Sequence, residues 1–175
     1  MTPYSQGDLD GLCGIYAIIN AIKLISKRKS LKEWQKLFLN IIRAQLKSKK
    51  SAKFLVNGIT IDDLAKLLRK AIKANPGVTF KRPFKNLESI DLSDFWSDLQ
   101  NFLNNNENHR CVIIVYSTKT SSHWTVVQGI SPNRLKLHDS IHSRFINRKT
   151  CTTLNLEEGK TVLIEFTSTL YLEAR

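Results

Sequence analysis

Cys13 stands where a loop gives way to an apolar helix. The loop holds residues that favour turns and helix N-caps, namely Gly7, Asp8, Asp10 and Gly11. Apolar residues then recur at helical spacing at Ile15, Ile18, Ile19 and Ile22. We therefore expect Cys13 in the first turn of a buried helix. Free backbone N–H groups and the positive end of the helix dipole favour a thiolate there, which makes Cys13 a candidate nucleophile.

A cysteine nucleophile needs a histidine to exchange protons and a third group to orient the imidazole ring. His123 opens an apolar segment, His123–Val127, that predicts a strand. Asp139 follows the next predicted strand, Arg134–His138, at an interval of 139 − 123 = 16 residues. This interval suits neighbouring antiparallel strands joined by a hairpin. The sequence therefore predicts that His123 and Asp139 lie near each other on neighbouring strands.

The region around Cys13 resembles the nucleophile region of papain-like cysteine hydrolases, in which a glutamine and a short loop precede Cys-Gly at the start of an apolar helix. It is most similar to the bacteriocin-leader-peptidase (double-glycine peptidase) branch, where small and apolar residues follow Cys-Gly. The chain order Gln6, Cys13, His123, Asp139 is also the order of that family. The resemblance implies a papain-like fold, a catalytic triad of Cys13, His123 and Asp139, and Gln6 in the oxyanion hole.

Two positions depart from the family pattern. Gln6 precedes Cys13 by 13 − 6 = 7 residues, whereas the family usually places its glutamine slightly closer. Either the loop from Gly7 to Gly11 absorbs the extra residue, or backbone N–H groups line the oxyanion hole in place of Gln6. Asp139 is followed by Ser140, where leader peptidases tend to have proline.

Other reactive residue types have simpler interpretations. Cys111 lies in a predicted buried strand and Cys151 in a polar stretch, so we interpret both as structural. His138, Asp139 and His142 are too loosely spaced, and too far from any cysteine, for a metal site. We expect neither a metal nor a cofactor. Asn20 is interpreted as a polar helix-packing residue.

Length and composition predict an ordinary globular protein. The 175 residues suggest one domain, 1–175, with enough core to fold without disulfides or metal. No apolar run reaches the length of a membrane span, and the N-terminus lacks signal-peptide features. The three cysteines are scattered, which predicts a reducing compartment such as the cytoplasm, including that of a target cell into which an effector is delivered.

The positive charge lies in the N-terminal half. Residues 1–90 hold 18 Lys and Arg against 6 Asp and Glu, whereas residues 91–175 hold 9 of each. Such a field attracts acidic proteins, anionic membrane surfaces or nucleic acid. Aromatic residues are not interleaved with these charges, so a base-stacking surface is disfavoured. A solubilising helix surface explains the same charge and is slightly preferred.

Periodicity predicts helices first and strands afterwards. We expect helices over 12–28, after a Ser30–Glu33 capping box, after a Thr60 cap, and after Asp91 or Ser93. A basic loop is expected at 48–53. Strands are expected at 78–82, 111–116, 123–130, 134–138 and 161–166, the last of which we expect to be the final strand. The prediction is an α+β fold of two layers, with N-terminal helices packed on a C-terminal antiparallel sheet.

Two functional hypotheses follow. The first is a cysteine hydrolase, a peptidase or a glutamine deamidase, that cleaves an amide bond of a protein or peptide substrate. The second is a non-catalytic basic module on the same scaffold that docks an acidic protein or, less favoured, nucleic acid. The hydrolase ranks first because a pure scaffold has no need to keep Cys13, His123 and Asp139 together.

Overall fold

The computed structural model describes residues 2–7, 10–26, 29–49, 52–104 and 109–174. The helices are α1 (Cys13–Ile25), α2 (Leu31–Lys49), α3 (Phe54–Asn57), α4 (Ile61–Lys73) and α5 (Leu92–Leu103). The strands are β1 (Val78–Lys81), β2 (His109–Ser117), β3 (Ser122–Ile130), β4 (Arg134–Leu137), β5 (Phe145–Asn147), β6 (Cys151–Thr152), β7 (Val162–Ile164) and β8 (Leu170–Ala174). Two short 3₁₀ turns, η1 (Arg148–Thr150) and η2 (Phe166–Ser168), link the last strands.

Local capping signals define where two of the helices begin. Before α2, the Ser30 hydroxyl accepts a hydrogen bond from the Glu33 N–H at 3.3 Å, and the Glu33 carboxylate accepts one from the Ser30 N–H at 2.8 Å. Before α4, the Thr60 hydroxyl accepts from the Asp63 N–H at 3.3 Å. The predicted capping box and the Thr60 cap are therefore confirmed.

The strands form a mixed but mainly antiparallel sheet in the order β1-β8-β2-β3-β4-β5. A short extension continues from β2 to β7 and then to β6, and the β6–β7 pair is parallel. The central hairpin of β2 and β3 places Tyr116 opposite His123 and Ser117 opposite Ser122. This register puts the first residues of β3 at one end of the sheet, beside the turn that follows β4.

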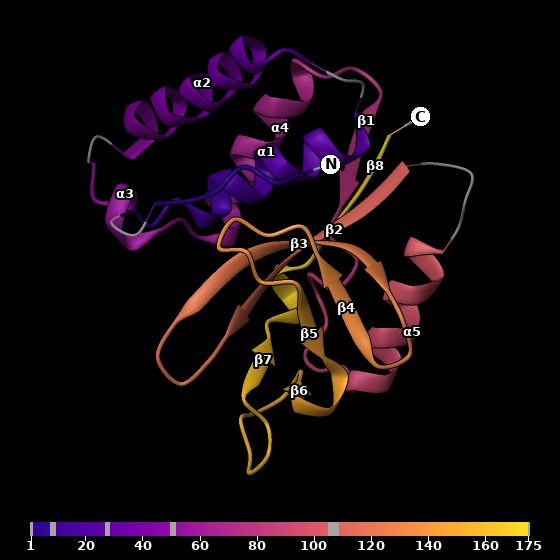
Figure 1. Cartoon of the computed structure of the whole chain (residues 1–175). Coiled ribbons are helices and arrows are strands. Elements are labelled where there is room, and N and C mark those ends of the chain that lie inside the picture. The colour runs from indigo at the N-terminus through magenta and orange to yellow at the C-terminus, as the bar shows by residue number, and fades with distance from the viewer. Residues whose placement is uncertain (1, 8–9, 27–28, 50–51, 105–108, 175) are drawn as a thin grey trace.

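Helices cover both faces of the sheet (Figure 1). On one face α1 packs against β2 and β3, and α2 and α4 pack on α1. On the other face Phe95, Trp96 and Leu99 of α5 pack with Val112, Ile114 and Val127. The chain is α+β as predicted, but the expectation of two layers is wrong, because α5 covers the opposite face.

The largest error in the predicted elements concerns the C-terminal segment. Residues 161–166 were expected to be the final strand, but β8 follows them and lies in the sheet between β1 and β2. β5 lies outside all the strands that the sequence predicts. The expected basic loop at 48–53 begins later, because α2 runs to Lys49, and its residues 50–51 lie outside the described residues. In the described part of the chain, every helix is too short or too polar to cross a bilayer.

Candidate active site

Cys13 is the first residue of α1, as its flanking sequence predicts. The N-cap residue is Leu12, whose carbonyl accepts from the N–H groups of Ile15 at 2.8 Å and Tyr16 at 2.9 Å. Among the described residues, none accepts a hydrogen bond from the N–H of Cys13 or Gly14. Within the described part of the chain these two amides have no acceptor, and N–H groups at the start of a helix stabilise negative charge such as that of a thiolate. The side chain is buried, with 9% of the residue exposed.

The loop before Cys13 is held by close backbone packing. The Gly11 N–H donates to the Leu55 carbonyl at 2.6 Å. A Cβ atom on Gly11 would lie 2.2 Å from the Val56 carbonyl oxygen, so a larger residue would displace the backbone. The Asp10 carboxylate also accepts from the Leu12 N–H at 3.1 Å. Asp10 and Gly11 thus hold the start of α1 in place through their contacts with Leu12, Leu55 and Val56.

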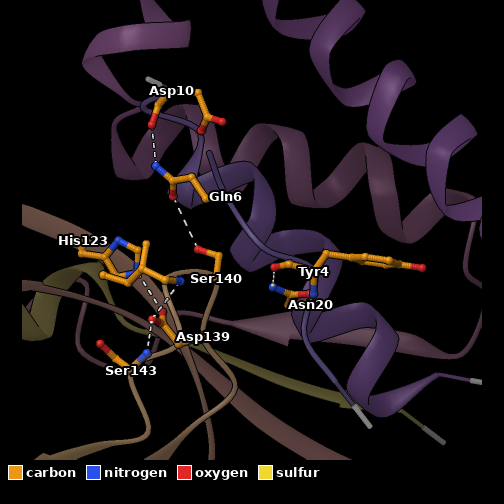
Figure 2. Close-up of polar contacts among 9 residues, drawn as sticks. Tyr4, Gln6, Asp10, Asn20, His123, Asp139, Ser140 and Ser143 are labelled. Carbon is orange, nitrogen blue, oxygen red and sulfur yellow. Dashed lines mark hydrogen bonds and ion pairs between the residues drawn. The ribbon is translucent and has the colours of Figure 1, made fainter. Parts of the chain in front are cut away.

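His123 lies between Asp139 and Cys13. Its Nε2 atom is 2.7 Å from Asp139 Oδ1, and both side chains are almost fully buried (Figure 2). The Cys13 thiol lies beside the ring, close enough to raise the pKa of His123, and Nδ1 is the ring nitrogen that the bond to Asp139 leaves available to it. The structure therefore brings together the three residues that the sequence predicts to meet.

Asp139 is fixed by the turn in which it lies. Its Oδ2 atom accepts hydrogen bonds from the backbone N–H groups of Ile141 and Ser143, each at 3.2 Å (Figure 2). His142 adopts a positive φ of 63°, which lets the chain fold back so that both amides face the carboxylate. The carboxylate is thereby held in one orientation toward His123.

The electrostatics of the pair favour an imidazolium. Burial by itself lowers the pKa of His123, but its bonds to Asp139 and Cys13 outweigh burial and raise the pKa to about 9. For Asp139, burial raises the pKa, and the His123 bond and neighbouring polar groups reverse this and lower it. His123 is therefore charged at neutral pH while Asp139 remains a carboxylate.

Gln6 lies at the edge of this site, between Asp10 and Ser140 (Figure 2). Its Nε2 atom donates to the Asp10 carbonyl at 2.5 Å, and its Oε1 atom accepts from the Ser140 hydroxyl at 3.5 Å. The backbone N–H of Gln6 donates to the Ser140 carbonyl at 3.0 Å. The Gln6 side-chain amide has a second N–H that this bond to Asp10 does not use. The role of Gln6 in the oxyanion hole stays a prediction.

Tyr116 is a neighbour that the sequence interpretation missed. It lies opposite His123 across the β2–β3 pair, and the two rings make an edge contact with centroids 5.6 Å apart. Burial and the nearby Asp139 charge raise the pKa of Tyr116, which keeps the phenol neutral. The signal was available, because Tyr116 ends the predicted strand 111–116 and His123 begins the next predicted strand, 123–130, so a hairpin brings the two residues close.

The remaining cysteines and histidines lie outside this cluster. Cys111 is fully buried, and its Sγ atom is 3.8 Å from the Ala21 carbonyl oxygen. Burial raises the pKa of Cys151 to about 12, and its thiol donates to the Asn147 carbonyl. His138 is buried, while His142 faces the Ser5 hydroxyl at 3.3 Å. The described residues contain no group of three or more His, Cys, Asp or Glu arranged to hold a metal ion.

Comparison with known proteins identifies no relative of this chain. No protein-family model, no curated protein and no solved structure matches it significantly. The functional argument therefore depends on the geometry of the site.

Proposed function

We propose that this chain is a cysteine hydrolase that cleaves an amide bond of a protein or peptide substrate. The observation that carries the proposal is the buried hydrogen bond between His123 and the Asp139 carboxylate, with the Cys13 thiol close enough to the imidazole ring to raise its pKa. Nucleophile, proton carrier and orienting carboxylate are the three roles that amide hydrolysis by cysteine needs. We include in this proposal a papain-like fold, which the resemblance of the region around Cys13 implies.

The first half of the reaction forms a thioester. The Cys13 thiolate attacks the carbonyl carbon, and the negative charge moves to the carbonyl oxygen. The free N–H of Cys13, with the second N–H of the Gln6 amide, stabilises this oxyanion. The C–N bond then breaks, the leaving amine takes a proton from the His123 imidazolium, and the acyl group remains on sulfur.

The second half returns the enzyme to its starting state. Neutral His123 takes a proton from water as the water oxygen attacks the thioester carbonyl. The C–S bond breaks, the acid is released, and Cys13 leaves as a thiolate beside the imidazolium. Asp139 remains a carboxylate throughout and holds the ring so that Nδ1 faces the sulfur.

A peptide library tests this proposal and separates the two reaction types. Wild-type protein, Cys13→Ala and the control Cys151→Ser are each incubated with a mixture of natural peptides, which is then analysed by mass spectrometry. New peptide termini identify a peptidase, and conversion of glutamine to glutamate identifies a deamidase. We expect one of these changes in the wild type and in Cys151→Ser, and neither in Cys13→Ala. Equal products from the wild type and Cys13→Ala would contradict the proposal.

A second candidate function is supported by the distribution of charge. The exposed faces of α2 and α4 carry Lys32, Lys36, Arg43, Lys47, Lys66, Arg69, Lys70 and Lys73. These helices form the outer part of the helical layer, away from the sheet (Figure 1). We propose as the alternative a module that docks an acidic protein on this surface without catalysis. Binding that weakens steeply with salt and is indifferent to Cys13→Ala would favour it.

A further inference from the structure

The N-terminal segment Tyr4–Gln6 is held against α1 by the buried side chain of Asn20. The Tyr4 N–H donates to Asn20 Oδ1 at 2.7 Å, and Asn20 Nδ2 donates to the Tyr4 carbonyl at 3.0 Å (Figure 2). Asn20 is only 1% exposed. Its amide therefore satisfies both backbone groups of one residue, as a neighbouring strand would in a sheet. This is a more specific contact than general helix packing.

The other end of the segment is held by the turn that follows Asp139. The Gln6 N–H donates to the Ser140 carbonyl at 3.0 Å, and the Ser140 hydroxyl donates to Gln6 Oε1. A donor at Oε1 fixes the orientation of the amide and turns Nε2 away from Ser140, toward the loop that leads to Cys13. The turn that orients His123 through Asp139 therefore also orients Gln6.

The positions of Asn20 and Cys13 relative to each other are fixed because both residues belong to α1. They are 20 − 13 = 7 residues apart, about two helical turns, and so lie on the same side of the helix. Gln6 is two residues beyond the Tyr4 backbone that Asn20 holds. The segment Tyr4–Gln6, held on α1 by Asn20, thus sets the position of Gln6 relative to Cys13.

We propose that Asn20 is a positioning residue that holds the Gln6 amide at the oxyanion hole through Tyr4. This inference rests on the proposed function, in which Gln6 donates to the oxyanion. Asn20 acts on the reaction only through Gln6, so its effect depends on Gln6 being present. The Tyr4 ring also packs on Trp34, with centroids 6.5 Å apart, in a contact that does not involve Asn20.

The test is a double-mutant cycle on the hydrolysis of a peptide identified in the library experiment. Gln6→Ala is expected to lower kcat about 100-fold, the usual effect of losing an oxyanion donor, with KM nearly unchanged. Asn20→Ala is expected to lower kcat about tenfold or more through misplacement of that donor. The double variant should be no slower than Gln6→Ala alone. The control is Ile18→Val, which removes a buried methyl group from the opposite side of α1.

Amide hydrogen exchange gives a second measurement that does not depend on activity. The backbone N–H of Gln6 donates to the Ser140 carbonyl, whereas the Asn20 side chain bonds to the Tyr4 backbone. In Asn20→Ala we expect the protection of the Gln6 N–H to fall about tenfold or more, because residues 4–6 lose their anchor on α1. In Ile18→Val we expect the protection to stay as in the wild type.

Three results would overturn the inference. Additive effects of Gln6→Ala and Asn20→Ala on kcat would show that Asn20 acts independently of Gln6. A Gln6→Ala variant with unchanged kcat would remove the donor role, even though hydrolysis by Cys13 would stand. Unchanged Gln6 protection in Asn20→Ala would show that Asn20 does not hold the segment. A wild type without hydrolysis would instead refute the proposed function, and exchange would still decide whether the anchor exists.

Discussion

His123 is the residue on which the proposed chemistry depends, because it is the only link between the carboxylate and the thiol among the described residues. Its ring is oriented by Asp139, whose second oxygen is itself held by two backbone amides. This arrangement limits the rotation of both side chains. A small change at Asp139 should therefore affect both the charge and the direction of the imidazole.

We expect hydrolysis to fall as the pH rises through about 9. The His123 pKa is raised to about 9, so above that pH the ring loses the proton that the leaving amine must accept. In Asp139→Asn the carboxylate is lost, so this alkaline limb should move to lower pH and kcat should fall roughly 100- to 10,000-fold. The measurement is kcat/KM against pH in the two proteins. An alkaline limb at the same pH in both would contradict the role given to Asp139.

At the scale of the elements, the start of α1 is the feature that sequence patterns describe best. The turn residues and apolar spacing predict that Cys13 begins a helix, the strand patterns place His123 and Asp139 on neighbouring strands, and the resemblance to papain-like hydrolases brings the three together. Local signals suffice because each residue lies at the end of a strongly patterned element. The Ser30 and Thr60 caps are similarly local.

Long-range pairing is what the sequence does not reveal. β8 is a short segment near the C-terminus, and its place between β1 and β2 depends on partners far away in the chain. The contact between Asn20 and Tyr4, 16 residues apart, is likewise invisible to periodicity. α5 has an apolar face like the other helices, and nothing local indicates which face of the sheet it covers.

The loop before α1 should be intolerant of even a methyl group at Gly11. Its Cβ position lies 2.2 Å from the Val56 carbonyl oxygen, which is backbone and cannot rotate away. Gly11→Ala should therefore lower the free energy of unfolding by about 1–3 kcal/mol and displace the Cys13 amide. Urea unfolding of Gly11→Ala and of the control Gly129→Ala tests this prediction.

The control is matched because Gly129 leaves room for a side chain. The nearest atom to its Cβ position is Lys136 Cβ at 4.0 Å, which is ordinary contact. We expect Gly129→Ala to change the unfolding free energy little. Equal stability of both variants would mean that the backbone around Val56 yields easily, and that the close packing of Gly11 does not hold the start of α1.

For the whole molecule, the buried titratable groups predict that stability decreases on both sides of neutrality. Burial, and then the Lys23 charge, lowers the pKa of His138 to about 4. Between about 4 and its unfolded value near 6.5 the unfolded chain binds more protons, so acid favours unfolding. For His123 the sign is opposite: its contribution is full below about 6.5 and is lost as pH rises through about 9.

Urea unfolding from pH 4 to pH 10 measures this profile. His138→Leu should remove much of the loss on the acid side, because a neutral apolar side chain has no proton to bind. It should leave the fall in unfolding free energy at alkaline pH unchanged, whereas His123→Ala should make that fall less steep. An acid limb of the same steepness in the wild type and His138→Leu would show that other groups, such as Asp139, dominate it.

The central claim is that His123 activates Cys13, and the direct measurement is the rate of Cys13 alkylation by iodoacetamide across pH. Peptide mass spectrometry resolves Cys13, which is 9% exposed, from Cys111 and Cys151, which are 0% exposed and serve as internal controls. The account predicts that wild-type Cys13 reacts faster than an ordinary thiol at neutral pH, and that His123→Ala slows this reaction. Ordinary thiol behaviour in both proteins, or a Cys13 that does not react, would contradict the account.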